Sequence, residues 1–186
     1  MDNLLGVRSV RLSHDQVLYK RPESTRTTAH ADQYHWPVSG PETITFWIPL
    51  QPVAPNQGRL RFFRGSHRLQ PEIRRQLFRL SAEEGEFFLL QCGFTEVEPL
   101  LDLGDATAHY GWTFHGSGCN LTKETRKVYG VVYMAADIKL VVPEYGPPLE
   151  FLHDWCPGAR VGGPMDSEHN PIVFTGSNFA TPIPSP

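Results

Sequence analysis

The sequence has few cysteines, no long apolar run and no marked excess of charge of either sign. Its three cysteines are an odd and widely spaced set, so a disulfide framework is not expected and a reducing, intracellular setting is the default. No apolar stretch approaches the roughly 20 residues that are needed to cross a bilayer. The N-terminus also lacks the basic and then apolar pattern of a signal peptide, and we therefore expect a cytoplasmic protein without a membrane partner.

Composition narrows the class of protein further. The net charge of -3 and the isoelectric point near 6.2 give no electrostatic reason to expect nucleic acid as a partner. A hydrophobic content of 40% with 20% charged residues argues against disorder and is enough for one domain with its own core. The 17 prolines and 16 glycines indicate many turns, which favours short strands over a helical bundle.

β-Branched and aromatic runs between turn residues predict an all-β domain with minor helix. The clearest strands are expected at residues 43–48 and 127–135. We predict further strands at 7–10, 17–19, 59–63, 86–91, 97–101 and 106–115, with a turn or bulge at 13–15. The one helix is expected at residues 71–80, where proline lies in the first turn and apolar side chains form a stripe.

This order of elements predicts a sandwich or barrel of the jelly-roll kind, although propensity alone does not separate it from an immunoglobulin-like sandwich. We expect residues 1–142 to form the core. Residues 143–186, rich in proline and glycine, are predicted to be a wrapping tail of the same domain with little regular structure.

A candidate metal site begins with His30-Ala31-Asp32. Residues two apart in a strand project to the same face, so this spacing aims an imidazole and a carboxylate into one space. Such a nitrogen and oxygen pair suits a divalent first-row metal that takes another ligand from elsewhere. An ordinary surface pair is the alternative, because His-x-Asp is frequent by chance. The nearby Trp36 could line a substrate pocket or belong to the core.

A second candidate stretch lies at residues 104–126. His115 is a possible third ligand, although it could also be a satisfied core histidine. Arg126 stands at the head of the buried strand, where a desolvated charge needs an anionic partner, and its fork of donors suits a carboxylate. The alternative is that Arg126 pairs with Glu124 or Asp137 on the surface.

Taken in order, these motifs resemble the phytanoyl-CoA dioxygenase family. The residues that carry the resemblance are His30-x-Asp32, Asn56-Gln57-Gly58-Arg59-Leu60, Arg64-Gly65-Ser66-His67, His115-Gly116-Ser117-Gly118-x-Asn120 and Arg126, with Trp155-Cys156-Pro157-Gly158 and Asn170-Pro171 in the tail. Members of this family are non-haem Fe(II)/2-oxoglutarate-dependent oxygenases on a double-stranded β-helix. The resemblance therefore implies this fold for residues 7–174, with Fe(II) as the metal, 2-oxoglutarate as cosubstrate and O₂ as oxidant.

The resemblance also implies roles for individual residues. His30, Asp32 and His115 would be the metal ligands and the catalytic centre. The cosubstrate would be bound by four further residues: Arg126 at its distal carboxylate, Ser117 as a hydroxyl donor beside it, Trp47 packed against it, and Gln33 as a weaker candidate for the pocket. His109 is interpreted as structural.

The implied reaction is oxidation, in the first instance hydroxylation, of a C–H bond in a small organic substrate, with release of succinate and CO₂. A CoA thioester, a fatty acyl chain, a terpenoid or a polyketide all remain admissible as substrate. Only 29 residues precede His30, whereas the family has a much longer helical segment there. We therefore expect a homodimer or a partner subunit that covers this region. The alternatives are a catalytically silent metal-binding jelly-roll subunit and a redox-neutral, isomerase-type member of the same fold.

Overall fold

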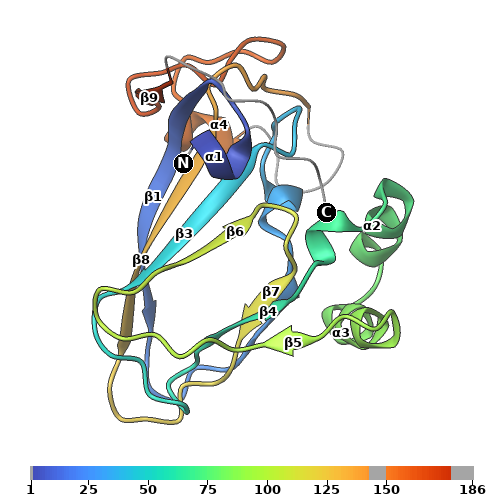
Figure 1. Ribbon diagram of the computed structural model, residues 1–186, viewed down its shortest axis with the longest axis vertical. Helices are drawn as coiled ribbons and strands as arrows, with labels where there is room; N and C mark the ends of the chain where they lie inside the picture. Colours follow the sequence, from blue (N-terminus) through green and yellow to red (C-terminus); the bar gives the residue numbers. More distant parts are fainter. Residues whose placement is uncertain (1, 143–149, 177–186) are drawn as a thin grey trace.

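The computed structural model describes residues 2–142 and 150–176, and its strands form two antiparallel sheets (Figure 1). Side chains of both sheets line a cavity. The larger sheet has the order β6-β3-β8-β1-β9 and the smaller one the order β2-β7-β4-β5. The larger sheet contains β1 (Ser9–Lys20), β3 (Thr43–Pro49), β6 (Thr107–Tyr110), β8 (Arg126–Ala135) and β9 (Ile172–Thr175). The smaller sheet contains β2 (Thr27–His30), β4 (Leu60–Phe63), β5 (Glu96–Val97) and β7 (His115–Ser117). This arrangement confirms the predicted all-β, double-stranded β-helix class.

Helices are short and lie outside the two sheets. They are α1 (Asp2–Leu5), α2 (Pro71–Phe78), α3 (Ala82–Gln91) and α4 (Glu150–Trp155), with 3₁₀ turns η1 (Asp32–His35) and η2 (Ser66–Arg68). The helix expected at residues 71–80 is α2, and α3 follows it on the same side of the smaller sheet (Figure 1). Over residues 2–142 and 150–176, none of the helices has the length and apolar character that a bilayer crossing requires.

The centre of the larger sheet is the pair β1 and β8. Both predicted N-terminal strands belong to one strand, β1, which is interrupted by a register shift between Leu12 and His14. This confirms the predicted bulge, in which one extra residue bends the strand and re-aims its side chains. From the bulge onwards, alternate residues of β1 line the cavity between the sheets: His14, Gln16, Leu18 and Lys20.

The prediction of a strand at residues 86–91 is wrong, because these residues belong to α3. Ser81 caps this helix: its hydroxyl accepts a hydrogen bond from the Glu84 amide (3.3 Å), and the Glu84 carboxylate accepts one from the Ser81 amide (2.8 Å). This capping box was legible in the sequence as Ser-x-x-Glu before an apolar run. A short apolar run alone does not separate a buried strand from a buried helix face.

The prediction of one strand at residues 106–115 is also wrong. A turn, in which the Thr113 amide donates to the Tyr110 carbonyl (2.8 Å), divides this stretch into β6 and β7, which lie in different sheets. His109 and His115 therefore come from facing sheets. The strand predicted at 97–101 is reduced to Glu96–Val97, paired with the end of β4.

The tail is more regular than expected in its described part. Strand β9 pairs with β1 at the edge of the larger sheet, and Cys156 and Met165 pack into a core cluster with Met134 and Leu140. Asn170 is fully buried, and its side-chain amide donates to the carbonyls of Ser13 (2.7 Å) and Trp155 (2.9 Å). Residues 143–149 and 177–186 of the predicted tail lie outside the described residues, and the division of the chain at residue 142 stays a prediction.

The packing of helix α3 against the smaller sheet can be tested with two adjacent leucines, one buried and one exposed. Leu89 is fully buried in a cluster with Phe63 and Leu77, whereas Leu90 is 53% exposed. We expect Leu89→Ala to lower the free energy of unfolding by about 2–5 kcal/mol, because it removes buried methyl groups and leaves a cavity. The matched Leu90→Ala variant should change it by less than about 0.5 kcal/mol. Urea denaturation measures both, and equal losses would contradict this packing.

Candidate metal centre

Two histidines lie opposite each other on neighbouring strands of the smaller sheet. His30 ends β2 and His115 begins β7, and the antiparallel register places them directly opposite, with ring centroids 4.4 Å apart. The residue between His115 and Ser117 is Gly116, where a Cβ atom would lie 2.6 Å from the Thr27 carbonyl oxygen. A glycine is therefore needed for β2 and β7 to approach this closely.

Each of the two imidazoles is oriented by a backbone carbonyl. The Nδ1 atom of His30 lies 3.0 Å from the Thr28 oxygen, and that of His115 lies 2.9 Å from the Thr113 oxygen. Because the carbonyl accepts a hydrogen bond from the Nδ1–H group, the proton stays on Nδ1 and the Nε2 lone pair is directed into the cavity, as a metal requires. Burial lowers the pKa of both histidines, which keeps the imidazoles neutral and able to act as ligands.

Asp32 is the third residue of the candidate metal site, beside His30 and His115. It lies in η1 rather than in the strand predicted for His-x-Asp, yet its Oδ1 atom is 3.6 Å from Nε2 of His30 and 3.6 Å from Nε2 of His115. One ligand atom from each of the three residues lies within 4.8 Å of the others. Burial alone would raise the pKa of Asp32, but the imidazoles of His115 and His109 outweigh this effect and hold the pKa well below its ordinary value. Two neutral nitrogens and one ionised oxygen fit a divalent first-row metal.

The group opens into a cavity of about 430 Å³ between the two sheets. Arg126, Ser117, Trp47 and Trp36 also line this cavity, so the structure brings most of the sequence-predicted site residues together. Gln33 does not reach it. Its side chain is used in the fold instead, accepting a hydrogen bond from the Thr43 hydroxyl (2.6 Å) and donating one to the Gly40 carbonyl (3.0 Å).

Arg126 is a buried cation without a carboxylate partner in the part of the chain that the structure describes. It is 6% exposed, one Nη atom donates to the Gly58 carbonyl, and its Nε atom has no hydrogen-bond partner. Its guanidinium lies over the Trp47 ring, 5.2 Å from the centroid. Burial lowers the pKa of Arg126 to about 10, so it remains charged at neutral pH. The surface pairing with Glu124 or Asp137, considered from the sequence, is not what the structure shows.

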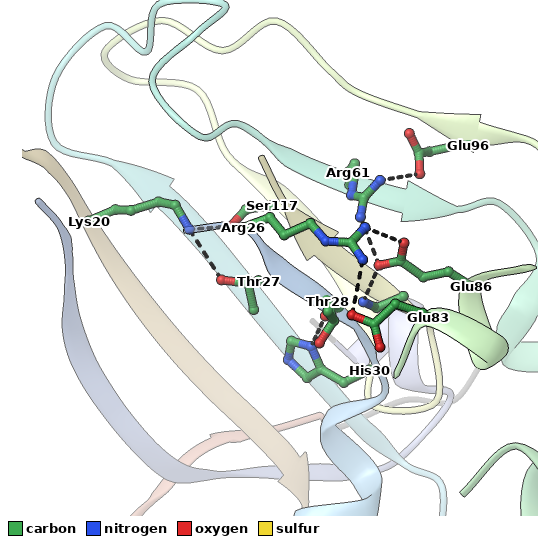
Figure 2. A network of polar contacts seen from close by, with 11 residues as sticks. Lys20, Arg26, Thr27, Thr28, His30, Arg61, Glu83, Glu86, Glu96 and Ser117 are labelled. Carbon is green, nitrogen blue, oxygen red and sulfur yellow. Dashed lines mark hydrogen bonds and ion pairs between the residues drawn. The ribbon is translucent and has the colours of Figure 1, made fainter. Parts of the chain in front are cut away.

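Lys20 is a second buried cation at the same end of the cavity, and the sequence analysis missed it. Its Nζ atom donates to the hydroxyls of Ser117 (3.1 Å) and Thr27 (3.3 Å), as Figure 2 shows. Burial and the neighbouring Arg126 charge both lower the pKa of Lys20. Two like charges that are buried together call for an anion between them. The sequence could have indicated this role, because Lys20 is two residues after Leu18 and so projects to the same inward face of β1.

Glu86 of α3 clamps the strand that carries His30. Its carboxylate accepts hydrogen bonds from the Ala29 amide (2.8 Å), from Arg61 on β4 (2.8 Å) and from Arg26 (2.9 Å). Figure 2 shows Arg26 and Arg61 meeting at the Glu86 carboxylate. Ala29 lies in β2, one residue before His30. Arg26 also reaches Glu83 (3.3 Å), but the Glu83 side chain is 69% exposed, whereas that of Glu86 is 12% exposed.

These two glutamates form a matched pair for mutation. We expect Glu86→Ala to lower the free energy of unfolding by about 2 kcal/mol, because the Ala29 amide and the Arg61 guanidinium lose a charged acceptor. It should also weaken metal binding, since β2 loses its anchor next to His30. Glu83→Ala removes only an exposed contact and should leave both properties unchanged. Denaturation and metal titration of the two variants measure the difference, and equal behaviour would contradict the clamp.

Comparison with known proteins identifies the family to which the chain belongs. No curated protein matches the chain, but the family model "Phytanoyl-CoA dioxygenase (PhyH)" matches residues 2–128. Among solved structures, the non-heme alpha ketoglutarate dependent carbocyclase SnoK from nogalamycin biosynthesis has a TM-score of 0.77 at 26% identity, over 92% of this chain and 64% of SnoK. The epimerase SnoN from the same biosynthesis has a TM-score of 0.73 at 28% identity, over 92% of this chain and 66% of SnoN.

SnoN has also been solved in complex with Fe³⁺, alpha ketoglutarate and nogalamycin RO, at 28% identity and a TM-score of 0.71. EctD from S. alaskensis is similar in fold alone, with 21% identity, a TM-score of 0.62, and coverage of 78% of this chain and 52% of EctD. The chain thus spans about two thirds of the length of SnoK and SnoN and about half of that of EctD. The family model covers more than half of the sequence, and the chain belongs to the phytanoyl-CoA dioxygenase family.

Proposed function

We propose that this chain is an Fe(II)/2-oxoglutarate-dependent dioxygenase that oxidises a C–H bond of a small organic molecule, with O₂ as oxidant. The observation that carries the proposal is one cavity that holds both a two-histidine, one-carboxylate group and a pair of buried cations that no carboxylate of the described residues neutralises. The enzyme class of the structurally similar proteins SnoK and SnoN supports it.

His30, Asp32 and His115 would hold Fe(II). This donor set is the one that non-haem Fe(II) oxygenases use, and it leaves coordination positions open for other ligands. The two imidazoles need no proton removed before binding, because burial already favours their neutral form. Asp32 supplies the single negative charge that partly balances the metal.

Arg126 and Lys20 would bind the distal carboxylate of 2-oxoglutarate. The Arg126 guanidinium supplies donors in a planar fork, and the Lys20 ammonium adds a second charge from the opposite strand. The Ser117 hydroxyl, which already accepts from Lys20, can donate its own proton to the same carboxylate. Trp47 forms the wall beside them.

When bound, the iron and 2-oxoglutarate supply the oxidising chemistry, and the cosubstrate leaves as succinate and CO₂. The protein's own part is to hold the reactants in place and to keep the ionic groups away from bulk water. At the end of the cavity farther from the cations, level with Thr45 in the sheet, the lining includes His14 and Trp36. Burial lowers the pKa of His14 to about 4, so this end carries no positive charge at neutral pH and suits a neutral part of the substrate.

A redox-neutral reaction at the same site is the second candidate, because the structurally similar SnoN is an epimerase. The complete ligand group, together with the two cations, favours either enzyme over the silent subunit considered from the sequence. The homodimer or covering partner and the cytoplasmic location stay predictions.

Cosubstrate binding is testable without knowledge of the substrate. Under anaerobic conditions, Fe(II) and 2-oxoglutarate should give the weak visible charge-transfer band of the chelated cosubstrate, and Asp32→Ala should abolish it. We expect Arg126→Leu and Lys20→Met each to raise the apparent Kd for 2-oxoglutarate by about 10- to 100-fold, because each removes a hydrogen bond to a charged group. Lys127→Met is the control, since Lys127 is exposed on the neighbouring position of β8. Unchanged affinity in the Arg126 and Lys20 variants would place the anion site elsewhere.

Turnover then separates the candidate functions. Admitting air to the complex should release succinate, faster when the correct substrate is present. Incorporation of ¹⁸O from ¹⁸O₂ into the organic product identifies hydroxylation, whereas an isomeric product without ¹⁸O identifies the redox-neutral or rearranging reaction. A folded, iron-loaded protein that gives neither the band nor succinate would overturn the proposed activity.

A further inference from the structure

The carboxylate of Asp32 lies between the two sheets, and its two oxygens face different ones. Oδ1 faces the two histidines of the smaller sheet, each at 3.6 Å. Oδ2 faces the larger sheet, where it accepts a hydrogen bond from the Thr45 hydroxyl (3.1 Å) and lies 3.6 Å from Nε2 of His109. Thr45 and His109 are direct partners in the register of β3 and β6. The pair His30 and His115 of the smaller sheet thus lies beside Oδ1 of Asp32, and the pair Thr45 and His109 of the larger sheet lies beside Oδ2.

His109 has no other polar role in the described part of the chain. Its side chain is 3% exposed, and neither of its ring nitrogens has a hydrogen-bond partner there. Its remaining neighbours are rings: His115 at a centroid distance of 4.4 Å and Phe62 at 5.1 Å. A buried imidazole N–H without an acceptor is unfavourable, and the nearby carboxylate oxygen is the acceptor that this site offers.

We infer that His109 is a positioning residue for Asp32: together with Thr45 it holds Oδ2 against the larger sheet, so that Oδ1 alone faces the metal position. This inference rests on the metal site of the proposed function and goes beyond it. It also changes the structural role that the sequence suggested for His109. Nε2 of His109 lies 3.6 Å from Oδ2, whereas the ligand atoms that lie within 4.8 Å of one another come from His30, Asp32 and His115. His109 therefore orients a ligand and is not one itself. Partners of this kind fix the direction of a ligand and raise metal affinity.

The choice of substitution matters, because His109 also separates two cavities. It lines the metal cavity on one side and a lateral cavity of about 510 Å³ on the other, which reaches Val97 of β5 and Tyr110 of β6. An alanine would join the two cavities and admit water. His109→Phe keeps the wall and removes both nitrogens, while His109→Gln restores a side-chain N–H near Oδ2. The two variants separate the loss of the hydrogen-bond donor from the loss of bulk.

The test is titration of the folded full-length protein with Fe(II) under anaerobic conditions and with Co(II). We expect His109→Phe to weaken metal binding by about 10- to 100-fold, the usual effect of losing such an outer partner, and His109→Gln to recover most of the loss. Thr45→Val should weaken binding as well. The double variant should lose less than the sum of both losses, because the two side chains act on one oxygen. His67→Phe, which alters the lateral cavity alone, is the control and should bind as the wild type does.

The visible bands of the Co(II) protein distinguish positioning from ligation. If His109 positions Asp32, the band pattern of His109→Phe at saturating Co(II) keeps the coordination number of the wild type. Loss of a ligand in these bands, or wild-type affinity in His109→Phe, would overturn the inference while the metal site stands. A wild-type protein that binds neither metal would overturn the metal site itself, and the inference with it.

Discussion

The site depends first on the register of β2 and β7. Antiparallel pairing puts His30 opposite His115, and no other alignment of these two short strands would bring both imidazoles to one point. Several otherwise unrelated features maintain this register: Gly116 allows the close approach of the strands, the Thr28 and Thr113 carbonyls fix both rings, and Glu86 ties β2 to α3 and β4. A shift of one of these strands by one residue would turn its histidine to the other face of the sheet, away from the histidine of its neighbour.

The charges of the cavity are arranged in two groups of opposite sign. Asp32 is the anion at the metal position, and Lys20 and Arg126 are the cations at the far end. Among the described residues the two cations have no carboxylate partner, and Asp32 has only the Thr45 hydroxyl and imidazoles around it, which costs free energy. A divalent metal beside Asp32 would offset the cost at this carboxylate, and a dianion that chelates this metal and reaches the cations would offset the cost at the cations. The same arrangement disfavours a neutral molecule in the place of the cosubstrate.

Sequence reasoning found the parts of the site that are local or carried by the family motifs. His30, Asp32, His115 and Arg126 were named from spacing and resemblance, and the long buried strand β8 from its alternation. Lys20 and His109 were missed as site residues because their roles depend on which face of a strand meets the other sheet. That depends on a bulge in β1 for Lys20, and for His109 on the turn that splits residues 106–115 between the sheets. Neither property is local to the residue concerned.

The helix at 82–91 was mistaken for a strand for a different reason. Its apolar residues are nearly continuous, so hydrophobic periodicity carried little information, and the capping box before it was the better signal. Gln33 shows the reverse error. Its position next to Asp32 in sequence suggested the pocket, but the 3₁₀ turn directs its side chain to Thr43 and Gly40.

The two ends of the cavity are built differently, and this bears on what each can recognise. The cationic end uses residues of β1, β7 and β8, which the two sheets hold rigidly. At the other end, His14 stands at the bulge of β1 with its ring 4.4 Å from that of Trp155, and Asn170 of the tail fixes the bulge through the Ser13 carbonyl. Segments outside the sheets tolerate change better than the strands do. The cationic end, where we propose that the cosubstrate binds, is therefore constrained by the fold, and the end proposed for the substrate depends on how the tail packs against the β1 bulge.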